Sequence, residues 1–326
     1  MREKGLSMQH YPLVTIVGGS GFVGRHTVKA LAAAGYRIRV LVRDSVAAEF
    51  LKTAATVGQI AIEHVDMTRP ETLAGKFAGS DAVINLVSIA YESGRQKFGA
   101  INVEGARIVA EEAAKAGAAR FIQMSGLGVD RATTTKYGTT KLAGEDAVRK
   151  AFPGATVLRP SVIVGPEDKF FQRFARMSML APALPLIGGG HTKFQPVLVT
   201  DVAAAILACL KQPDTAGKTY ELGGPKTYSF RELLELLARI INRRPRLINL
   251  PRPLASLQAF FFELIFCITR CTAPIRFTPP LTRDQVRLLA HDNVVNAGAL
   301  TFRDLGMEAG AIEDVLPAQL ARYVKA

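Results

Sequence analysis

The chain of 326 residues contains no tryptophan and only three cysteines. Three cysteines are too few for a disulfide framework. Cys267 and Cys271 lie four residues apart without a nearby histidine, which is not a typical zinc spacing. We therefore expect no metal site and a reducing compartment. With 48% hydrophobic residues, the chain can build a buried core without such supports.

Acidic residues are scarce relative to basic ones, 28 against 41, which gives a formal net charge of +13. This balance favours acidic partners: anionic phospholipid headgroups, an acidic protein surface or nucleic acid. No zinc finger or RNP-type aromatic signature is present, so we expect no nucleic-acid partner. The first twelve residues lack the apolar segment of a secretory signal, and we expect a cytosolic protein of bacterial type.

Residues 14–44 show a strand, a glycine-rich turn, an Ala/Leu-rich helix and a second strand. In this order, Gly18 permits a tight turn, Gly21 lets backbone N–H groups approach a pyrophosphate, and Gly24 lets helix and strand pack closely. A glycine cluster by itself more often makes an ordinary turn, but here the strand, the turn and the helix of a dinucleotide-binding unit follow one another in the required order. The predicted dinucleotide contacts in this unit are Gly18, Gly21, Phe22, Val23, Gly24 and Arg25.

The end of the second strand indicates which dinucleotide is bound. Sites that prefer NAD usually carry an acid there, whereas this chain has Val42-Arg43-Asp44. Arg43 can pair with a ribose 2′-phosphate, and Arg25 can add a second guanidinium, so we predict NADPH (NADP). The alternative is that both arginines are solvated surface residues, with Asp44 close enough to pair with Arg43.

Strands and helices continue to alternate through residues 60–65, 70–77, 82–87, 102–116 and 120–124. Such alternation predicts an α/β fold: a Rossmann-type doubly wound parallel sheet with a smaller C-terminal substrate-side lobe. Asp66 and Met67 follow the third strand, where the carboxylate can bind an adenine amino group. A turn or capping role for Asp66 is about equally compatible with its position.

Tyr137 and Lys141 are spaced i, i+4 on a predicted helix, so the ammonium can lie beside the phenol. A nearby positive charge lowers a tyrosine pKa, which suits proton transfer. Ser125 ends the preceding strand and can hold a substrate carbonyl, while Lys141 can also bind the nicotinamide ribose. The catalytic candidates are therefore Ser125, Tyr137 and Lys141.

We divide the chain into an N-terminal tail (1–12), an NADP-binding Rossmann domain (13–165, with a return segment 194–212) and a smaller lobe (166–193 and 213–326). Within the lobe, residues 239–287 hold nine arginines, no lysine and two acids. We predict that 239–287 is a docking segment, since arginine favours forked contacts to carboxylates and phosphates. Truncation after about Ala238 is expected to spare much of the Rossmann half.

The docking segment encloses an apolar, Phe-rich stretch, residues 254–269. At sixteen residues with Gln258 and Glu263 inside, it is too short and too polar for a transmembrane span. In a helix, Ser256, Glu263 and Arg270 form one polar line, which leaves a wide apolar face. We expect this helix to lie among headgroups or in a protein groove near a membrane; a lid over the lobe's own core is the alternative.

Several motifs occur in the order seen in one superfamily: the glycine turn, Asn102-Val103-x-Gly105, Ser125, Tyr137-x-x-x-Lys141, Arg159-Pro160-Ser161 and Asp201-Val202-Ala203. The chain thus resembles the extended and atypical short-chain dehydrogenase/reductases over residues 13–240. Residues 158–175, 188–203 and 281–295 are similar to the short-chain-dehydrogenase-like accessory subunit of respiratory complex I, and these strings extend the resemblance almost to the C-terminus.

The resemblance implies a tightly held NADPH with a structural role. Carried over by position, it adds Pro160, Ser161 and Ile163 to the nucleotide contacts, which also include Gly18, Gly21, Gly24, Arg25, Arg43, Asp66 and Lys141. The family implies an accessory, non-catalytic subunit near the membrane junction. In bacteria this would be peripheral on the cytoplasmic side of the inner membrane, with other complex I subunits as partners.

The sequence nevertheless retains Ser125, Tyr137 and Lys141, a complete catalytic set. The alternative function is therefore a free NADP-dependent reductase or sugar-nucleotide epimerase/dehydratase, in which Tyr137 transfers the proton. An assembly factor that leaves the finished complex is a third possibility. Purification from membranes separates the first two, because a free enzyme should remain in the soluble fraction.

Overall fold

A seven-stranded, all-parallel sheet forms the centre of the computed structural model, which describes residues 12–272 and 279–325. Its strand order is β11-β6-β5-β4-β1-β2-β3. The strands are β1 (Leu13–Val17), β2 (Arg37–Val42), β3 (Ile60–His64), β4 (Ala82–Asn85), β5 (Arg120–Met124), β6 (Thr156–Pro160) and β11 (Thr219–Leu222). Successive crossovers run in opposite directions from the β1/β4 boundary, and this topology places a crevice at the carboxyl ends of these two strands.

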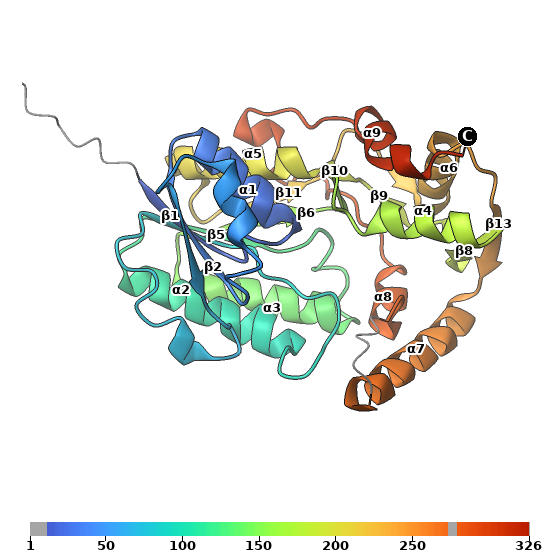
Figure 1. The fold of residues 1–326 in the computed structure, drawn as a ribbon, viewed down its shortest axis with the longest axis horizontal. Helices are drawn as coiled ribbons and strands as arrows, with labels where there is room; N and C mark the ends of the chain where they lie inside the picture. The colour runs from blue at the N-terminus through green and yellow to red at the C-terminus, as the bar shows by residue number, and fades with distance from the viewer. Residues whose placement is uncertain (1–11, 273–278, 326) are drawn as a thin grey trace, which may run out of the picture.

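Helices cover both faces of the sheet (Figure 1). On one face, α1 (Phe22–Ala33) packs against α5 (Val199–Lys211), and on the other α2 (Ala106–Lys115) packs against α3 (Lys136–Ala151). Strands covered on both faces read as nearly continuous apolar runs, as residues 14–17 do with the single exception of the buried Thr15. The expected α/β Rossmann-type architecture is thus confirmed.

Short strand pairs and helices build the smaller lobe beyond the carboxyl ends of the sheet strands. Its strand pairs are β7 (Ile163–Val164) with β10 (Val197–Leu198), β9 (Lys193–Phe194) with β12 (Tyr228–Ser229), and β8 (Ala183–Ile187) with β13 (Arg246–Leu250). Helices α4 (Phe170–Leu180), α6 (Phe230–Ile240) and α9 (Leu316–Leu320) enclose a separate core, which includes Phe171, Leu184, Leu233 and Leu316.

The C-terminal part of the chain returns to the main sheet, which changes the domain boundaries that we expected. Strand β11 pairs with β6 and belongs to the central sheet, although residues 213–326 were assigned to the lobe. Phe302 and Leu305 also pack into the main core. Truncation after Ala238 would therefore remove part of the Rossmann core, so it is a poor test of the docking segment.

Three predicted elements differ locally from the structure. The helix expected over 70–77 is only a 3₁₀ turn, Pro70–Thr72, because the chain turns through positive φ at Gly75 and Gly79. The helix expected from Asn102 begins with a π-helical turn, Gly99–Gly105, before α2. The single strand expected over 194–199 is divided into β9 and β10 on either side of Pro196, which lacks a backbone donor.

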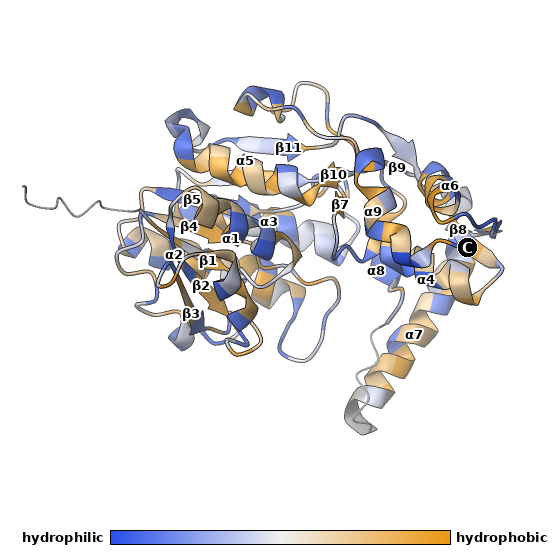
Figure 2. Ribbon diagram, turned by 45° about the horizontal axis from the view of Figure 1, so that its top comes forward, coloured by the Kyte–Doolittle hydropathy of each residue, from blue (hydrophilic) through white to orange (hydrophobic). Residues whose placement is uncertain are grey.

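Helix α7 (Arg252–Thr272) projects from the lobe and contacts the short helix α8 (Arg283–Leu288), as Figure 1 shows. Among the side chains of α7 that the structure describes, residues 252–269, the fully buried ones are the small residues Ala255 and Ala259. Many of its large apolar side chains are exposed, among them Leu257 (52%), Phe261 (52%) and Ile268 (55%), and Figure 2 shows the hydrophobic colouring along the helix. A lid over the lobe's own core would bury these residues, so that alternative does not hold.

The polar side of α7 faces the protein. Glu263 accepts hydrogen bonds from the backbone N–H and the Nε of Arg283, both at 2.8 Å. The window Arg252–Thr269 is long and apolar enough to cross a membrane by length and composition, whereas we expected too short a segment. Core helices of soluble proteins can meet the same two criteria, and the ion pair to α8 holds the middle of α7 against the protein.

Candidate functional site

The glycine-rich turn forms the floor of a cavity at the crevice between β1 and β4. Gly18 has φ +87°, and a Cβ on Gly24 would lie 2.5 Å from the carbonyl oxygens of Gly18 and Gly19. A Cβ on Gly21 would meet only Gly18 O, at 3.3 Å. Apart from its chain neighbours, no other atom of the described residues lies within 4 Å of that position, which leaves room for a ligand beside Gly21. Helix α1 begins after Gly21 without a side-chain cap or an acid in its first turn. Its N-terminal N–H groups therefore suit an anion.

This first cavity has a volume of about 200 Å³ and lies at the carboxyl ends of four strands. Its lining includes Gly18 and Gly21 from the turn, Arg43 after β2, and Met67 after β3, all of them predicted contacts. Phe22 and Val23 do not line it: Phe22 packs edge-on against His26, and Val23 packs on the main core. They can face a pyrophosphate only through their backbone N–H groups.

Arg43 is the basic side chain in the lining of this cavity. Within the described part of the chain it makes no side-chain hydrogen bond or ion pair, and it is exposed. Asp44 accepts a hydrogen bond from the Ala47 N–H at 2.9 Å, so its carboxylate is used in the following turn. The alternative pairing of Arg43 with Asp44 is therefore not seen.

Arg25 is engaged elsewhere, contrary to its predicted role as a second phosphate contact. It forms an ion pair with Glu167 at 3.3 Å, donates to Ser20 O at 3.3 Å and stacks over Phe50 at 4.9 Å. His26 also bonds Glu167, at 3.0 Å. Burial raises the pKa of Glu167, but His26 and Arg25 outweigh it and the net shift is downward. Glu167 is 142 residues away from Arg25, and no local pattern indicated this contact.

Asp66 has the geometry of a turn residue. Its Oδ1 accepts hydrogen bonds from the N–H and the hydroxyl of Thr68, at 2.9 and 2.8 Å. Burial raises the pKa of Asp66, but these bonds and the charges of Arg43 and Arg69 lower it overall. The neighbouring residues Val65 and Met67 line the cavity, whereas Asp66 does not. The turn role is thus observed, and an adenine contact stays a prediction.

Ser125 and Lys141 are buried near each other at the end of β5. Ser125 is 6% exposed, and its Oγ has no hydrogen-bond partner within the described residues. Lys141 is 3% exposed and donates to Met124 O at 3.2 Å. Burial lowers the pKa of Lys141 to about 8, although the charge of Glu145 opposes the shift. An unpartnered hydroxyl beside a buried ammonium is suited to a polar ligand such as a ribose.

Tyr137 lies next to this pair but is not activated as we expected. Its hydroxyl lies close to Gly126, where an added Cβ would be 3.2 Å from the oxygen, and its ring packs edge-on against Phe98. Burial raises the pKa of Tyr137, and the nearby Ser88 hydroxyl only partly offsets this. Lys141 is not among the groups that lower it. The expected lowering by the lysine is therefore wrong.

Two features that the sequence analysis did not single out position α3. Thr135 caps the helix, since its hydroxyl accepts from the Gly138 N–H at 3.0 Å. The carboxylate of Asp284, from α8, accepts from the N–H groups of Lys136 and Tyr137. Thr135 was detectable as a capping residue before the helix, but a cap supplied from 147 residues away has no local signal.

Pro160 and Ser161 lie on the other side of Tyr137, in the lining of a second cavity. Ser161 Oγ donates to Asn293 Oδ1 at 2.6 Å, and Ile163 belongs to β7. The predicted nucleotide contacts therefore fall in two groups. The first cavity holds Gly18, Gly21, Arg43 and Met67, while Pro160 and Ser161 face the second.

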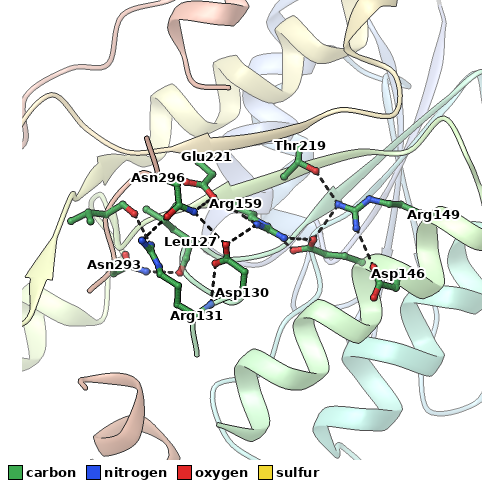
Figure 3. A network of polar contacts seen from close by, with 12 residues as sticks. Leu127, Asp130, Arg131, Asp146, Arg149, Arg159, Thr219, Glu221, Asn293 and Asn296 are labelled. Carbon is green, nitrogen blue, oxygen red and sulfur yellow. Dashed lines mark hydrogen bonds and ion pairs between the residues drawn. The ribbon is translucent and has the colours of Figure 1, made fainter. Parts of the chain in front are cut away.

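A polar network joins the C-terminal part of the chain to the site (Figure 3). Arg159 donates two hydrogen bonds to Glu145 of α3, at 3.0 and 2.8 Å. Asn296 bonds Glu221 of β11 at 2.9 Å, and Arg131 bonds Asn296 at 2.7 Å. The bonds of Asn296 hold this part of the chain against β11, the strand that pairs with β6. Among the described residues, no group of three or more His, Cys, Asp or Glu is placed to hold a metal ion.

Comparison with known proteins agrees with this architecture. The model of the "NAD dependent epimerase/dehydratase family" matches residues 14–223. An Arabidopsis thaliana protein named "NADH dehydrogenase [ubiquinone] 1 alpha subcomplex subunit 9, mitochondrial" is 35% identical, over 95% of this chain and 76% of that one. A ceramide reductase of Caulobacter vibrioides is 33% identical, over 74% of each chain.

Solved structures share the fold. The dTDP-glucose 4,6-dehydratase DesIV of Streptomyces venezuelae, solved with NAD and TYD bound, has a TM-score of 0.71 at 19% identity. The match covers 95% of this chain and 96% of that one. The chain therefore belongs to the NAD dependent epimerase/dehydratase family, where its relatives include the alpha subcomplex subunit 9 of mitochondrial NADH dehydrogenase.

Proposed function

We propose that the chain is an accessory, non-catalytic NADPH-binding subunit of respiratory complex I. The observation that carries this proposal is the 35% identity to a mitochondrial complex I subunit over 95% of the chain. That match includes the lobe, α7 and α8, and so extends beyond the nucleotide-binding half. We further propose a peripheral position on the cytoplasmic side of a bacterial inner membrane, corresponding to the matrix side in mitochondria.

The first cavity has the features that NADPH requires. Gly21 and the uncapped start of α1 offer N–H groups to a pyrophosphate, and Arg43 has no partner among the described residues that would compete with a 2′-phosphate. Ser125 and Lys141 lie outside the lining of this cavity, and we propose that their buried hydroxyl and ammonium contact the nicotinamide ribose. Because Arg25 is paired with Glu167, we assign the preference for NADP to Arg43 alone.

The state of Tyr137 supports a structural role for the nucleotide. A reductase or epimerase that uses the phenolate as a base needs a lowered tyrosine pKa, whereas burial raises it here. Lys141 donates to Met124 O and does not lower the phenol's pKa. We therefore expect Tyr137→Phe to leave nucleotide occupancy and complex assembly nearly intact. Loss of nucleotide occupancy and of assembly in this variant would contradict the hypothesis that the Tyr137 hydroxyl is dispensable.

Helix α7 supports docking beside a membrane. Its exposed apolar face is flanked by Arg252 at the N-terminal end, and the guanidinium of Arg283 lies over the ring of Phe260 at 5.2 Å. Basic residues beside an exposed apolar helix suit anionic headgroups or an acidic protein surface. We propose other complex I subunits as the partners, with anionic phospholipid headgroups as an additional contact.

Native purification tests this assignment. A chain tagged at its C-terminus should co-purify with complex I from detergent-solubilised membranes, and Leu257→Ser together with Phe261→Ser should reduce the recovery. Val57→Ser removes an exposed apolar side chain far from α7 and serves as the control. Undiminished recovery with the α7 variant would show that this helix does not dock. Recovery of the wild-type chain only in the soluble fraction would contradict the subunit assignment.

A second candidate is an NADP-dependent carbonyl reductase, favoured by the unpartnered Ser125 hydroxyl beside Tyr137 and by the 33% identity to a ceramide reductase. A phenol with a raised pKa keeps its proton at neutral pH, so it suits a proton donor better than a base. The test is NADPH oxidation by the purified chain with long-chain keto compounds, measured by absorbance. Turnover that disappears in Tyr137→Phe would establish this function instead.

A further inference from the structure

A second cavity of about 480 Å³ lies between the carboxyl ends of β5 and β6 and the smaller lobe. One wall consists of the aromatic side chains Phe170, Phe174, Phe194 and Phe230, which contact one another edge to face or at tilted angles. Leucine side chains from α8 and the residues around it, Leu281, Leu288 and Leu289, contribute to the same lining. Aliphatic and aromatic walls of this extent favour a hydrocarbon ligand.

The inner end of this cavity is polar and adjoins the first cavity. Tyr137 and Ser161 line it there, and Ser88, which lines the first cavity, is near enough to Tyr137 to influence the pKa of its phenol. A ligand in the second cavity would thus extend from the nucleotide side of the molecule into the apolar region of the lobe.

Arg173 is a charged group in the lining that has no acidic counter-ion among the described residues. It is half-buried, and its guanidinium donates to a backbone oxygen, that of Pro280, at 2.6 Å. Burial lowers the pKa of this guanidinium, and no carboxylate opposes the shift. A partly desolvated guanidinium without an acidic partner favours an anion. The exposed Lys169, one turn earlier, adds positive charge to the same lining, and the acid there, Asp292, accepts a hydrogen bond from the Lys193 N–H at 2.8 Å.

The cavity wall is continuous with the base of α7. Ile187 lines the cavity and packs in one small cluster with Ala255 and Ala259, the buried residues of α7. The N-terminal half of α7 therefore stands beside the cavity, with its exposed apolar face turned outward. If this face rests on a membrane, a lipid can reach the cavity without crossing a long stretch of water.

We propose that the second cavity binds a single acyl chain that ends in an anionic head, with the chain against the phenylalanines and the head at Arg173. The shared chemistry is that of a free fatty acid and of a lysophospholipid. This inference concerns binding alone, so it depends on neither turnover nor complex I docking.

The test uses the purified full-length chain and the fluorescent fatty acid cis-parinaric acid. The wild type should bind the probe saturably, and palmitate or lysophosphatidic acid should displace it. The competitor that displaces the probe at the lower concentration shows whether the anionic head is that of a fatty acid or of a lysophospholipid. Arg173→Gln should weaken displacement by palmitate about tenfold or more and leave displacement by uncharged dodecanol nearly unchanged. Arg176→Gln, one turn later and exposed, should behave as the wild type.

Two further variants separate the cavity from the surface of α7. Leu288→Trp should fill the cavity and reduce the amount of bound probe, whereas Phe261→Ser should not. The reverse pattern would place the probe on α7 and overturn the proposal, as would the absence of saturable binding. Displacement by UDP-glucose but not by palmitate would indicate a sugar-nucleotide site instead. The comparison of palmitate with dodecanol remains decisive even if Leu288→Trp does not fold.

Discussion

The carboxylate of Asp284 caps the helix that carries Tyr137. Its Oδ2 accepts from the Tyr137 N–H at 3.0 Å, and its Oδ1 accepts from the Lys136 N–H at 2.8 Å. Asp284 belongs to α8, the helix to which α7 is tied by the pair of Glu263 with Arg283. The segment proposed to dock on a partner is therefore joined to the nucleotide site by a short series of hydrogen bonds.

Removal of this cap should destabilise the fold. We expect Asp284→Ala to lower the free energy of unfolding by about 1 kcal/mol, because two N–H groups at the start of α3 lose their acceptor. Urea unfolding of the two proteins measures the difference. Asp146→Ala, at an exposed position in the middle of α3, controls for the loss of one acid. Equal stability of wild type and Asp284→Ala would show that water replaces the cap without cost.

Arg43 should determine the choice of nucleotide. Arg43→Asp removes a charge-assisted hydrogen bond to the 2′-phosphate, so the affinity for NADPH should fall by roughly 1.5–3 kcal/mol, or about 10- to 100-fold. The affinity for NADH should not fall, and calorimetric titration with both nucleotides measures the difference. Arg37→Asp, at the opposite end of β2, is the matched control. Bound NADH alone in the purified wild type would refute the assignment.

Substitutions at two glycines of the turn should affect different properties, one the stability of the fold and the other the binding of NADPH. Gly24→Ala places a methyl group 2.5 Å from two carbonyl oxygens, and we expect it to cost about 1–3 kcal/mol of stability. A Cβ on Gly21 meets only the carbonyl oxygen of Gly18, at 3.3 Å, so Gly21→Val should remain folded yet lose NADPH. Gly99→Ala, where a Cβ meets nothing within 4 Å, controls for the added methyl. Thermal unfolding and nucleotide extraction give the two measurements; full NADPH occupancy in Gly21→Val would contradict the predicted pyrophosphate position.

Lys141 should make stability depend on pH. Burial lowers its pKa from 10.5 to about 8, so the unfolded chain binds this proton more tightly than the folded one. The resulting destabilisation is absent above pH 10.5, grows as the pH falls and is complete below about pH 8. In nucleotide-free protein, Lys141→Met should therefore be more stable than the wild type at about pH 7, with a smaller difference at about pH 10.

Urea unfolding at the two pH values tests this prediction, and Lys150→Met, at the end of the same helix, is the control. The same Lys141→Met variant should bind NADPH more weakly, because it lacks the ammonium proposed to contact the ribose. A stability difference that does not change with pH would show that burial imposes no penalty on the Lys141 charge.

Local pattern predicted the parts of the site that lie within one β-α-β unit. Gly18, Gly21 and Arg43 are brought together by consecutive elements, and their spacing alone placed them at one sheet edge. The caps of α3 show the limit of this reasoning. Thr135 acts within its own helix and follows a local rule, whereas Asp284 acts across 147 residues and depends on how the lobe returns to the sheet.

The sequence by itself determined the Rossmann architecture and the glycine turn, because hydrophobic periodicity and backbone freedom are properties of short segments. Tertiary structure alone decided that Arg25 pairs with Glu167, that β11 completes the sheet, and that the apolar face of α7 points outward. It also decided the pKa of Tyr137, since burial depends on neighbours from distant segments. Pairing, desolvation and exposure are set by atoms that only folding brings together, and no local spacing encodes them.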